Sequence, residues 1–381
     1  MKLPPLMQRP DGQPVATAED RALCRAAWLQ TFTDGMYGPI PEAPQRLDIR
    51  RERFGEGERL VIEMTLAGKA FAVDAALWLP RERTGPVPII IGLGFLGPIG
   101  TGEGAGFPID RAAIIERSIA DTLRGGRLSE VNRGQHADRW PIRPLLKAGY
   151  GVLLSCYGSW VADHPRKWRR AKLGRAARSC AKTGALSLWA WAYQRLIDIA
   201  FRLDSIDRQR VVLAGHSRLG KAALWASAND ERVYAALINN SGCAGASLTR
   251  HPGGETLSKL IRFSHWTVLD KKTAADPTQL PVDQHQLIAC VAPRKVYVAS
   301  ASEDAWADPE GEYLALKAAA PFWGEEGLPS LETVWRPGRR AWSGQLGWHL
   351  RPGPHDMTSW DWRRFLAFLA RDGRGANADC R

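Results

Sequence analysis

The sequence predicts an α/β fold, a three-layer sandwich in which a mostly parallel central sheet lies between two layers of helices. Short apolar runs, each long enough for one buried strand, alternate along the chain with longer amphipathic runs typical of helices. This alternation favours a parallel sheet covered on both faces, because each crossover between parallel strands supplies a helix. The 381 residues suffice for a large core, and no long linker or internal repeat divides them, so we expect one domain over residues 1–381.

The amino-terminal part of the chain predicts one helix and an antiparallel pair of strands. Thr17 is placed to cap a helical pattern over 18–32, and a proline-rich stretch follows, so residues 1–45 are expected to form a helix and a lead-in segment. Apolar and polar residues then alternate over 59–66 and 69–79. This period of two is typical of half-buried antiparallel strands.

The rest of the chain carries the alternation of strands and helices. Two segments with weak periodicity, 97–137 and 241–283, are expected to be insertions at the carboxyl edge of the sheet, where ligands bind in such folds. The expected strands cover 87–91, 150–156, 211–214, 233–238, 295–299 and 333–335, and the expected helices cover 184–203, 221–228, 284–290, 311–319 and 359–370.

The charge balance narrows the class of partner. The chain has 52 Lys and Arg against 40 Asp and Glu, a formal charge of +12, which favours acidic polymers such as nucleic acid, an anionic membrane or a uronic-acid polysaccharide. The densest basic segment, 166–178, has no nucleic-acid-binding motif beside it, and a solvated helix face explains it. No apolar run is long enough to cross a bilayer. We therefore expect neither a nucleic-acid nor a membrane partner, and we take a monomer as the default.

The spacing of the cysteines indicates whether a metal cofactor is expected, and the amino-terminal residues indicate the expected cellular location. The six cysteines contain no C-x-x-C pair, so we expect no zinc site and no other cofactor. Residues 1–26 are polar and predict no secretory signal, so the chain is expected in the cytoplasm, or outside it if a leader has been removed. The cysteines are Cys24, Cys156, Cys180, Cys243, Cys290 and Cys380.

One serine lies at the junction of a predicted strand and a predicted helix. Ser217 is the third residue of Gly-His-Ser-Arg-Leu-Gly, which follows the apolar run 211–214. A strand that turns sharply into a helix around Gly-x-Ser is the nucleophile elbow of α/β-hydrolases. The second glycine, Gly220, comes one position later than in the commonest form of the motif. The alternative is a surface serine that caps a helix.

A serine nucleophile needs a base, and the base needs an orienting carboxylate. In α/β-hydrolases the order along the chain is serine, acid, histidine. Glu303 and Asp304 come just beyond the strand expected at 295–299, and His355 lies in a loop flanked by glycine and proline before the last helix. All three are expected at the same sheet edge as Ser217, with His355 as the base.

Each of these candidates has a rival. His349 lies nearer the last strand pattern, where packing or a backbone hydrogen bond could hold it. Asp308, followed by proline, is typical of a helix cap, and Glu312 lies in the helix that follows. His216 adjoins the nucleophile in sequence, but neighbours on a tight turn point apart, so we expect a structural role for it.

With these residues identified, the sequence resembles carbohydrate esterase family 15, the glucuronoyl esterases, and especially its bacterial branch. The resemblance rests on a series of segments in the family's order and spans roughly residues 32–370. The segments are RWPIRPLLKAGYGVLL, GHSRLGKAALWA, NNSGCAGASLTR, GGETLSKL, APRKVYVASASEDAWADPEGEYLA and GWHLRPGPHDMTSWDW. The serine turn with arginine after it and lysine four places on matches this family, and the late Gly220 is the family's normal form.

The resemblance implies a role for individual residues. Ser217 would be the nucleophile and His355 the base, and Arg218 would extend toward the oxyanion, where charge develops only as the ester is attacked. The residues that would hold the glucuronate ring are Lys221, Glu255 and Trp306.

The sequence departs from the family pattern at two places. Many members carry the catalytic acid where this chain has Asn240, and an amide cannot stabilise an imidazolium as a carboxylate does. Other members use an acid in the later loop, which here is Asp304. The loop after the strand at 87–91 is also altered, so contacts to the oxyanion from Gly94 or Phe95 stay open.

The resemblance implies a serine esterase that hydrolyses esters of (4-O-methyl-)glucuronic acid through an acyl-enzyme. The expected substrates are such esters on xylan or on lignin-carbohydrate fragments. Two alternatives remain at this point: an esterase of the same fold that acts on acetyl or aryl esters, and a noncatalytic carbohydrate-binding relative. The leaving alcohol and the need for the 4-O-methyl group are not fixed by the residues.

Overall fold

The computed structural model describes residues 1–170, 172–179, 182–324 and 327–371, and its core is a single sheet. Within these residues ten strands follow one another across the sheet in the order β1-β2-β3-β5-β4-β6-β7-β8-β10-β9. The six central strands, from β5 to β10, run parallel, and antiparallel strands flank them on both sides. The strands are β1 (Arg46–Phe54), β2 (Gly57–Leu66), β3 (Lys69–Trp78), β4 (Val87–Gly94), β5 (Gly151–Cys156), β6 (Ile206–His216), β7 (Ala235–Asn239), β8 (Lys295–Ala301), β9 (Arg340–Ser343) and β10 (Leu346–Arg351).

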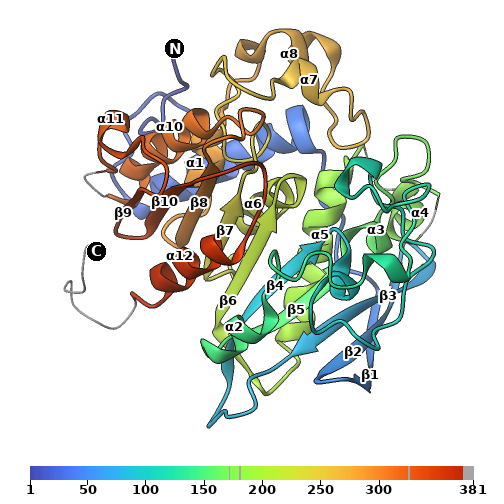
Figure 1. Ribbon diagram of the computed structural model, residues 1–381. Coiled ribbons are helices and arrows are strands. Elements are labelled where there is room, and N and C mark those ends of the chain that lie inside the picture. Colours follow the sequence, from blue (N-terminus) through green and yellow to red (C-terminus); the bar gives the residue numbers. More distant parts are fainter. Residues whose placement is uncertain (171, 180–181, 325–326, 372–381) are drawn as a thin grey trace.

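Helices cover both faces of the sheet, which gives the predicted three layers (Figure 1). Helices α2 and α12 lie on one face, where Trp140 and Trp362 pack at 5.5 Å between ring centroids. Helices α5, α6 and α9 lie on the other face. The helices are α1 (Ala18–Phe32), α2 (Ile142–Lys147), α3 (Tyr157–Trp160), α4 (Lys172–Ala176), α5 (Ala185–Ala200), α6 (Arg218–Asn229), α7 (Leu257–Leu260), α8 (Lys271–Ala275), α9 (Gln284–Ala289), α10 (Pro309–Ala319), α11 (Leu331–Val334) and α12 (Ser359–Leu369).

Most predicted elements are confirmed, because their patterns reflect burial. Helix α1 covers the predicted residues 18–32, and Thr17 caps it in a reciprocal capping box with Asp20. Strands β2 and β3 form the predicted antiparallel pair. Strand β1 escaped prediction because it is an edge strand whose residues are mostly exposed or half-buried, so its hydrophobic pattern is weak.

The strand expected at 333–335 is wrong. These residues belong to helix α11 and the turn that ends it, with Trp335 39 % exposed. The last two strands are β9 and β10, joined by a turn at Gly344 with φ of +46°. An alternation of three residues is too short to separate a strand from a turn of helix, whereas β10 is buried over its full length.

The two segments expected as insertions, 97–137 and 241–283, contain only short helices, and each contacts the serine turn. Glu116 of the first approaches Arg218, and Glu255 of the second binds Lys221. The described part of the basic segment 166–178 forms a turn and the short helix α4, not one continuous helical face.

Four of the six cysteines lie in the described part of the chain, and all four are buried and unbridged; they are Cys24, Cys156, Cys243 and Cys290. Cys180 and Cys380 lie outside the described residues. Within those residues no helix is both long and apolar enough to span a membrane.

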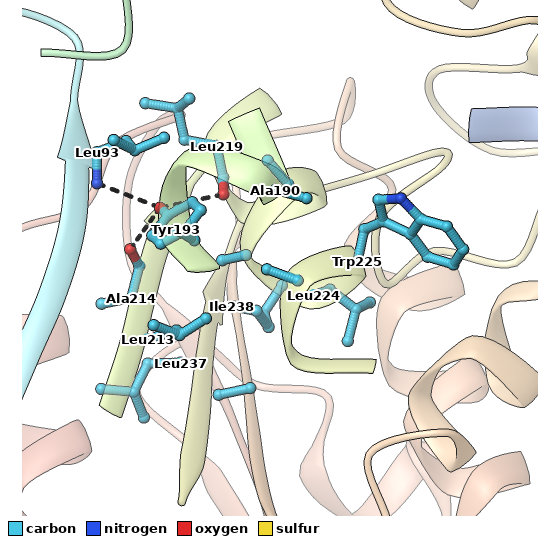
Figure 2. Packing of buried hydrophobic residues seen from close by; sticks show 14 of the residues in the cluster. Leu93, Ala190, Tyr193, Leu213, Ala214, Leu219, Leu224, Trp225, Leu237 and Ile238 are labelled. Carbon is cyan, nitrogen blue, oxygen red and sulfur yellow. Dashed lines mark hydrogen bonds between the residues drawn. The ribbon is translucent and has the colours of Figure 1, made fainter. Parts of the chain in front are cut away.

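A buried tyrosine joins the strands that carry the site to the helix behind them (Figure 2). The hydroxyl of Tyr193, on α5, accepts a hydrogen bond from the N–H of Leu93 at 3.3 Å and donates to the carbonyl of Ala214 at 2.9 Å. It also lies 3.5 Å from the carbonyl of Leu219. One side chain therefore connects β4, β6 and the start of α6, and so fixes the turn that carries Ser217.

Candidate active site

Ser217 occupies a strained turn between β6 and α6. Its φ of 57° and ψ of −129° lie outside the regions that ordinary side chains favour, as expected for a nucleophile elbow. The turn requires glycine at Gly215, because a Cβ there would lie 2.2 Å from the carbonyl oxygen of Leu219. The hydroxyl of Ser217 makes no capping hydrogen bond to α6. The alternative of a helix-capping serine is therefore wrong.

The structure brings His355 and Asp304 together, as predicted. They lie in the loops after β10 and β8, and Nδ1 of His355 is 2.5 Å from Oδ2 of Asp304. Burial alone would raise the pKa of Asp304, but its hydrogen bonds, the strongest from His355, hold this pKa below its usual value. Asp304 therefore stays ionised beside the imidazole at neutral pH.

Asn240, where the family resemblance predicts an acid in many members, contacts Asp304 instead. Its side-chain Nδ2 donates to Oδ2 of Asp304 at 2.7 Å, and its φ of 45° turns the chain sharply after β7. The backbone N–H of Ala307 donates to the other carboxylate oxygen at 3.1 Å. Asp304 is thus held from three sides, by two donors and by His355.

The rival histidine lies elsewhere. His349 is fully buried in β10, where Nε2 is 2.8 Å from Asp361 and Nδ1 is 3.0 Å from the hydroxyl of Tyr297. Both ring nitrogens are therefore engaged in the core.

The rival acids also have other partners. Asp308 caps α10 and accepts a hydrogen bond from Ser247 at 2.6 Å, as its position before proline predicted. Glu303 is exposed. Glu312 is fully buried and accepts hydrogen bonds from the backbone N–H groups of Ser241 and Gly242.

Ser217 and His355 line the same small cavity, of about 40 Å³. Within the described residues no hydrogen bond joins the serine hydroxyl to the imidazole. Because Nδ1 of His355 is bound to Asp304, Nε2 is the nitrogen left for the serine. Such contacts are often loose without substrate and tighten when it binds.

Arg218 is a buried cation beside the serine, held by an acid that the sequence analysis missed. One guanidinium nitrogen is 2.6 Å from Oδ2 of Asp163, and the guanidinium carbon is 4.6 Å from the centre of the Trp266 ring. Asp163 is buried and also accepts hydrogen bonds from His265, Trp266 and Tyr157. Its pKa would rise on burial, but Arg218, His265 and Trp266 lower this pKa well below its usual value.

A usable signal for Asp163 did exist in the sequence. It is an acidic residue that follows the buried strand β5, at the same sheet edge as Ser217. Its role could not be inferred without knowing that the loop turns inward toward α6.

The three residues expected to hold a sugar converge on the same cavity. Nζ of Lys221, on α6, is 2.5 Å from Oε2 of Glu255 and donates to the carbonyl of Cys243. Lys221 and Glu255 are almost fully buried, whereas Trp306 is 42 % exposed at the rim. A buried ion pair can form hydrogen bonds with hydroxyl groups. The indole beside it can pack against the face of a sugar ring.

The buried Glu312 predicts how stability depends on pH. Burial raises its pKa from 4.5 to about 7, despite the hydrogen bonds it accepts. Between these values the folded chain keeps a proton that the unfolded chain has lost, so the free energy of unfolding falls as pH rises, by about 3 kcal/mol for this group. Glu312→Gln should remove this dependence.

Urea unfolding of both proteins at pH 4.5, 6 and 8 measures the effect, with Glu310→Gln on the same helix as the control. The free energy of unfolding of Glu312→Gln minus that of wild type should rise with pH, by up to about 3 kcal/mol, because only wild type loses stability. A difference that is independent of pH would contradict the assignment.

Comparison with known proteins places the chain in a family. Residues 178–327 match the family model described as "Glucuronyl esterase, fungi". The chain is 33 % identical over 359 residues to "Carbohydrate esterase MZ0003" from an unknown prokaryotic organism, covering 89 % of this chain and 82 % of that protein. It is 26 % identical to a 4-O-methyl-glucuronoyl methylesterase of Hypocrea jecorina, where the match covers 81 % of this chain but only 58 % of that enzyme.

Solved structures agree. A promiscuous CE15 esterase from a marine bacterial metagenome superposes with a TM-score of 0.85 at 30 % identity, covering 97 % of this chain and 96 % of that one. A glucuronoyl esterase from Solibacter usitatus gives a TM-score of 0.86 at 31 % identity, covering 97 % of both chains. These matches confirm the predicted α/β-hydrolase fold and the predicted resemblance. The chain belongs to the glucuronoyl esterases, carbohydrate esterase family 15.

Proposed function

We propose that this chain, a carboxylic ester hydrolase of the glucuronoyl esterase family, cleaves esters of (4-O-methyl-)glucuronic acid through an acyl-enzyme on Ser217. The observation that carries the proposal is the convergence on one cavity of Ser217, the His355–Asp304 pair, the cation of Arg218 and the Lys221–Glu255 pair. The relative from Hypocrea jecorina is named for the hydrolysis of methyl esters of 4-O-methyl-glucuronate, which fits the same substrate class.

In the first step Oγ of Ser217 attacks the ester carbonyl while Nε2 of His355 takes the hydroxyl proton. The carbonyl π electrons move onto oxygen, and when they return the bond to the alcohol oxygen breaks. His355 gives its proton to that oxygen, and the alcohol leaves. Water then repeats the sequence against the acyl-enzyme, so that the uronic acid and free Ser217 result. Asp304 stabilises the imidazolium in both steps.

The negative oxygen of each tetrahedral intermediate needs fixed positive charge. Arg218 is the first residue of α6, so its backbone N–H lies among the donors that a helix leaves unpaired at its start. Its guanidinium is held by Asp163 before substrate arrives. Donors already in place cost no reorganisation during the reaction, which is why such groups contribute several kcal/mol. Phe95 lies beside this cation, since the guanidinium carbon of Arg218 is 5.7 Å from the centre of its ring.

The Lys221–Glu255 pair is suited to bind the acyl half of the substrate, the uronate ring. A uronate ring offers hydroxyl groups to both members of the pair, whereas an acetyl group offers none. Burying two charges is unfavourable unless they gain partners, so a pair at the wall of a cavity favours a polar ligand. This observation supports a sugar acid over the acetyl or aryl esters of the alternative hypothesis.

The second alternative, a noncatalytic carbohydrate-binding relative, rests on the loss of the usual acid at Asn240. The contact between Asp304 and His355 argues against it, because the imidazole has a buried carboxylate at 2.5 Å. The strained φ of Ser217 argues in the same direction. A protein that only bound carbohydrate would have no need of that strain.

A polymeric acidic substrate is consistent with the rim of the cavity. Nζ of Lys259 and the guanidinium carbon of Arg262 lie 5.4 Å and 5.8 Å from the centre of the Trp306 ring. Both side chains are exposed, and within the described residues neither forms an ion pair. Two exposed cations that have no acidic partner in the described part of the chain, beside an exposed indole, suit uronic-acid groups on xylan or on lignin-carbohydrate fragments.

The substrate assignment is tested by comparing kcat/KM for benzyl glucuronate, benzyl galacturonate and an aryl acetate. We expect the glucuronate to be preferred, because the ion pair is fixed in position and the galacturonate differs in one hydroxyl. A strong preference for the acetate would remove the assignment to uronate esters while leaving an esterase.

Trp306→Ala tests the sugar platform. We expect KM for benzyl glucuronate to rise about three- to tenfold, the value of one aromatic contact, with kcat retained. The preference for glucuronate over aryl acetate should fall by the same factor. Trp335→Ala is the matched control, since Trp335 is similarly exposed and does not line the cavity. Equal effects of the two substitutions would contradict the assignment.

A further inference from the structure

His216, the residue before the nucleophile, lies against the proposed base. Neighbours on a tight turn point apart, so a structural role is expected for it, yet its ring centroid is 4.5 Å from that of His355, with 39° between the planes. His216 is 3 % exposed, whereas the side chain of His355 is 37 % exposed. The ring of His355 therefore rests against a buried ring while more than a third of its side chain stays exposed.

His216 is itself held firmly. It is the last residue of β6, paired in register with Asn239 of β7, and its Nδ1 lies 2.6 Å from Oδ1 of Asn239. The ring of Phe95 packs edge-on against it, at 6.0 Å and 82°. The ring of His216 thus has the rigidity of the central sheet.

His355 lacks such rigidity. It lies in the loop between β10 and α12, and its only hydrogen bond within the described residues is the one from Nδ1 to Asp304. A single hydrogen bond fixes one ring atom but leaves the ring free to rotate about that contact. A base that serves two proton transfers needs its Nε2 directed at the same point throughout.

We propose that His216 is a positioning residue, whose ring face sets the plane of His355 and keeps Nε2 directed at the hydroxyl of Ser217. Asp304 fixes one atom of the imidazole, and the face of His216 fixes the rotation that remains. The inference rests on the proposed function, because it assigns His355 as the base.

The charge state of His216 suits this role. Burial lowers its pKa well below the usual value, and positive charge on His355 and Arg139 lowers it further, against the bond to Asn239. His216 is therefore neutral at the pH where His355 works. A charged neighbour would repel the imidazolium that forms on His355 in each step.

The test compares His216→Phe with His216→Leu, two apolar side chains of which only Phe keeps a flat ring face. Both lose the bond to Asn239, so that loss is common to the pair. We expect kcat in the Leu variant to fall about ten- to a hundredfold, the range for a displaced catalytic group, with KM within about twofold. The Phe variant should stay within about threefold of wild type. Melting temperatures report on folding separately.

A second readout does not depend on the substrate assignment. The rate at which a fluorophosphonate labels Ser217 needs the base but no glucuronate, and it should fall in the Leu variant in parallel with kcat. If wild type labels rapidly but hydrolyses no glucuronate ester, the proposed substrate is wrong and the role of His216 is still measured. Equal labelling rates in the Phe and Leu variants, whether both fast or both slow, would overturn the proposal.

Discussion

Replacing Ser217 with alanine is expected to lower kcat for benzyl glucuronate about a millionfold, the loss seen when a serine hydrolase loses its nucleophile. The reason is that Ser241, the other serine lining the cavity, donates its hydroxyl to Glu312 at 3.0 Å and, among the described residues, has no histidine base in contact with it. His355 and Arg218 remain in place and assist only the slow attack of water. The rate is measured by release of benzyl alcohol at high enzyme concentration.

The variant should fold as wild type does, because the hydroxyl of Ser217 makes no capping bond to α6. Its melting temperature and circular dichroism spectrum check this. Ser264→Ala is the matched control, because Ser264 is an exposed serine in the segment 241–283 and does not line the cavity. Hydrolysis that survived in folded Ser217→Ala would contradict the proposed mechanism.

The second large effect is expected from Asp304→Asn, which should lower kcat about ten-thousandfold with little change in KM. The amide has the shape of the carboxylate but carries no charge to stabilise the imidazolium on His355. Its NH₂ group can also donate to Nδ1, which would select the wrong tautomer of the base. Initial rates over a range of benzyl glucuronate concentrations separate kcat from KM.

Glu303→Gln is the control for Asp304→Asn, because it removes the neighbouring, exposed carboxylate. We expect wild-type activity from it. Full activity in Asp304→Asn, or a large loss in Glu303→Gln, would show that the acid had been assigned to the wrong residue. The pair therefore tests which of the two adjacent carboxylates orients the base.

Residues with strained backbone angles are concentrated at the sheet edge that carries Ser217, Asp304 and His355. Of the six described residues other than glycine with positive φ, four lie between Ser217 and Asp308: Ser217, Asn240, Ala244 and Asp308. Three of these carry or support site residues, since Ser217 is the proposed nucleophile, Asn240 binds Asp304, the proposed acid, and Asp308 caps α10. Strained residues persist where the surrounding structure fixes them, so this edge is built for precise placement and not for stability.

The sequence was sufficient for the parts of the site that local patterns encode. Ser217 could be identified because a strand, a turn and a helix leave three distinct patterns in adjacent residues. Asp304 and His355 could be proposed because the carboxyl ends of parallel strands meet at one edge. Loop context then favoured His355 over His349, because glycine and proline flank His355 whereas His349 lies in the last strand pattern.

The remaining features depend on contacts between distant segments, which no local pattern encodes. The bond from Asn240 to Asp304 joins residues 64 positions apart, so the apparent loss of an acid concealed a donor to the acid. The contact of His216 with His355 requires both loop geometries at once. Asp163 was missed because an isolated acidic residue after a strand resembles any surface residue until the fold buries it.

Catalysis through an acyl-enzyme requires that the uronyl group become covalently attached to Ser217. The most direct measurement is mass spectrometry of peptides from enzyme mixed with benzyl glucuronate and quenched in acid within milliseconds. We predict that the peptide containing Ser217 gains the mass of one uronyl group, and that the adduct decays at the rate of turnover. Turnover without any adduct on this peptide, or an adduct on another residue, would contradict the mechanism.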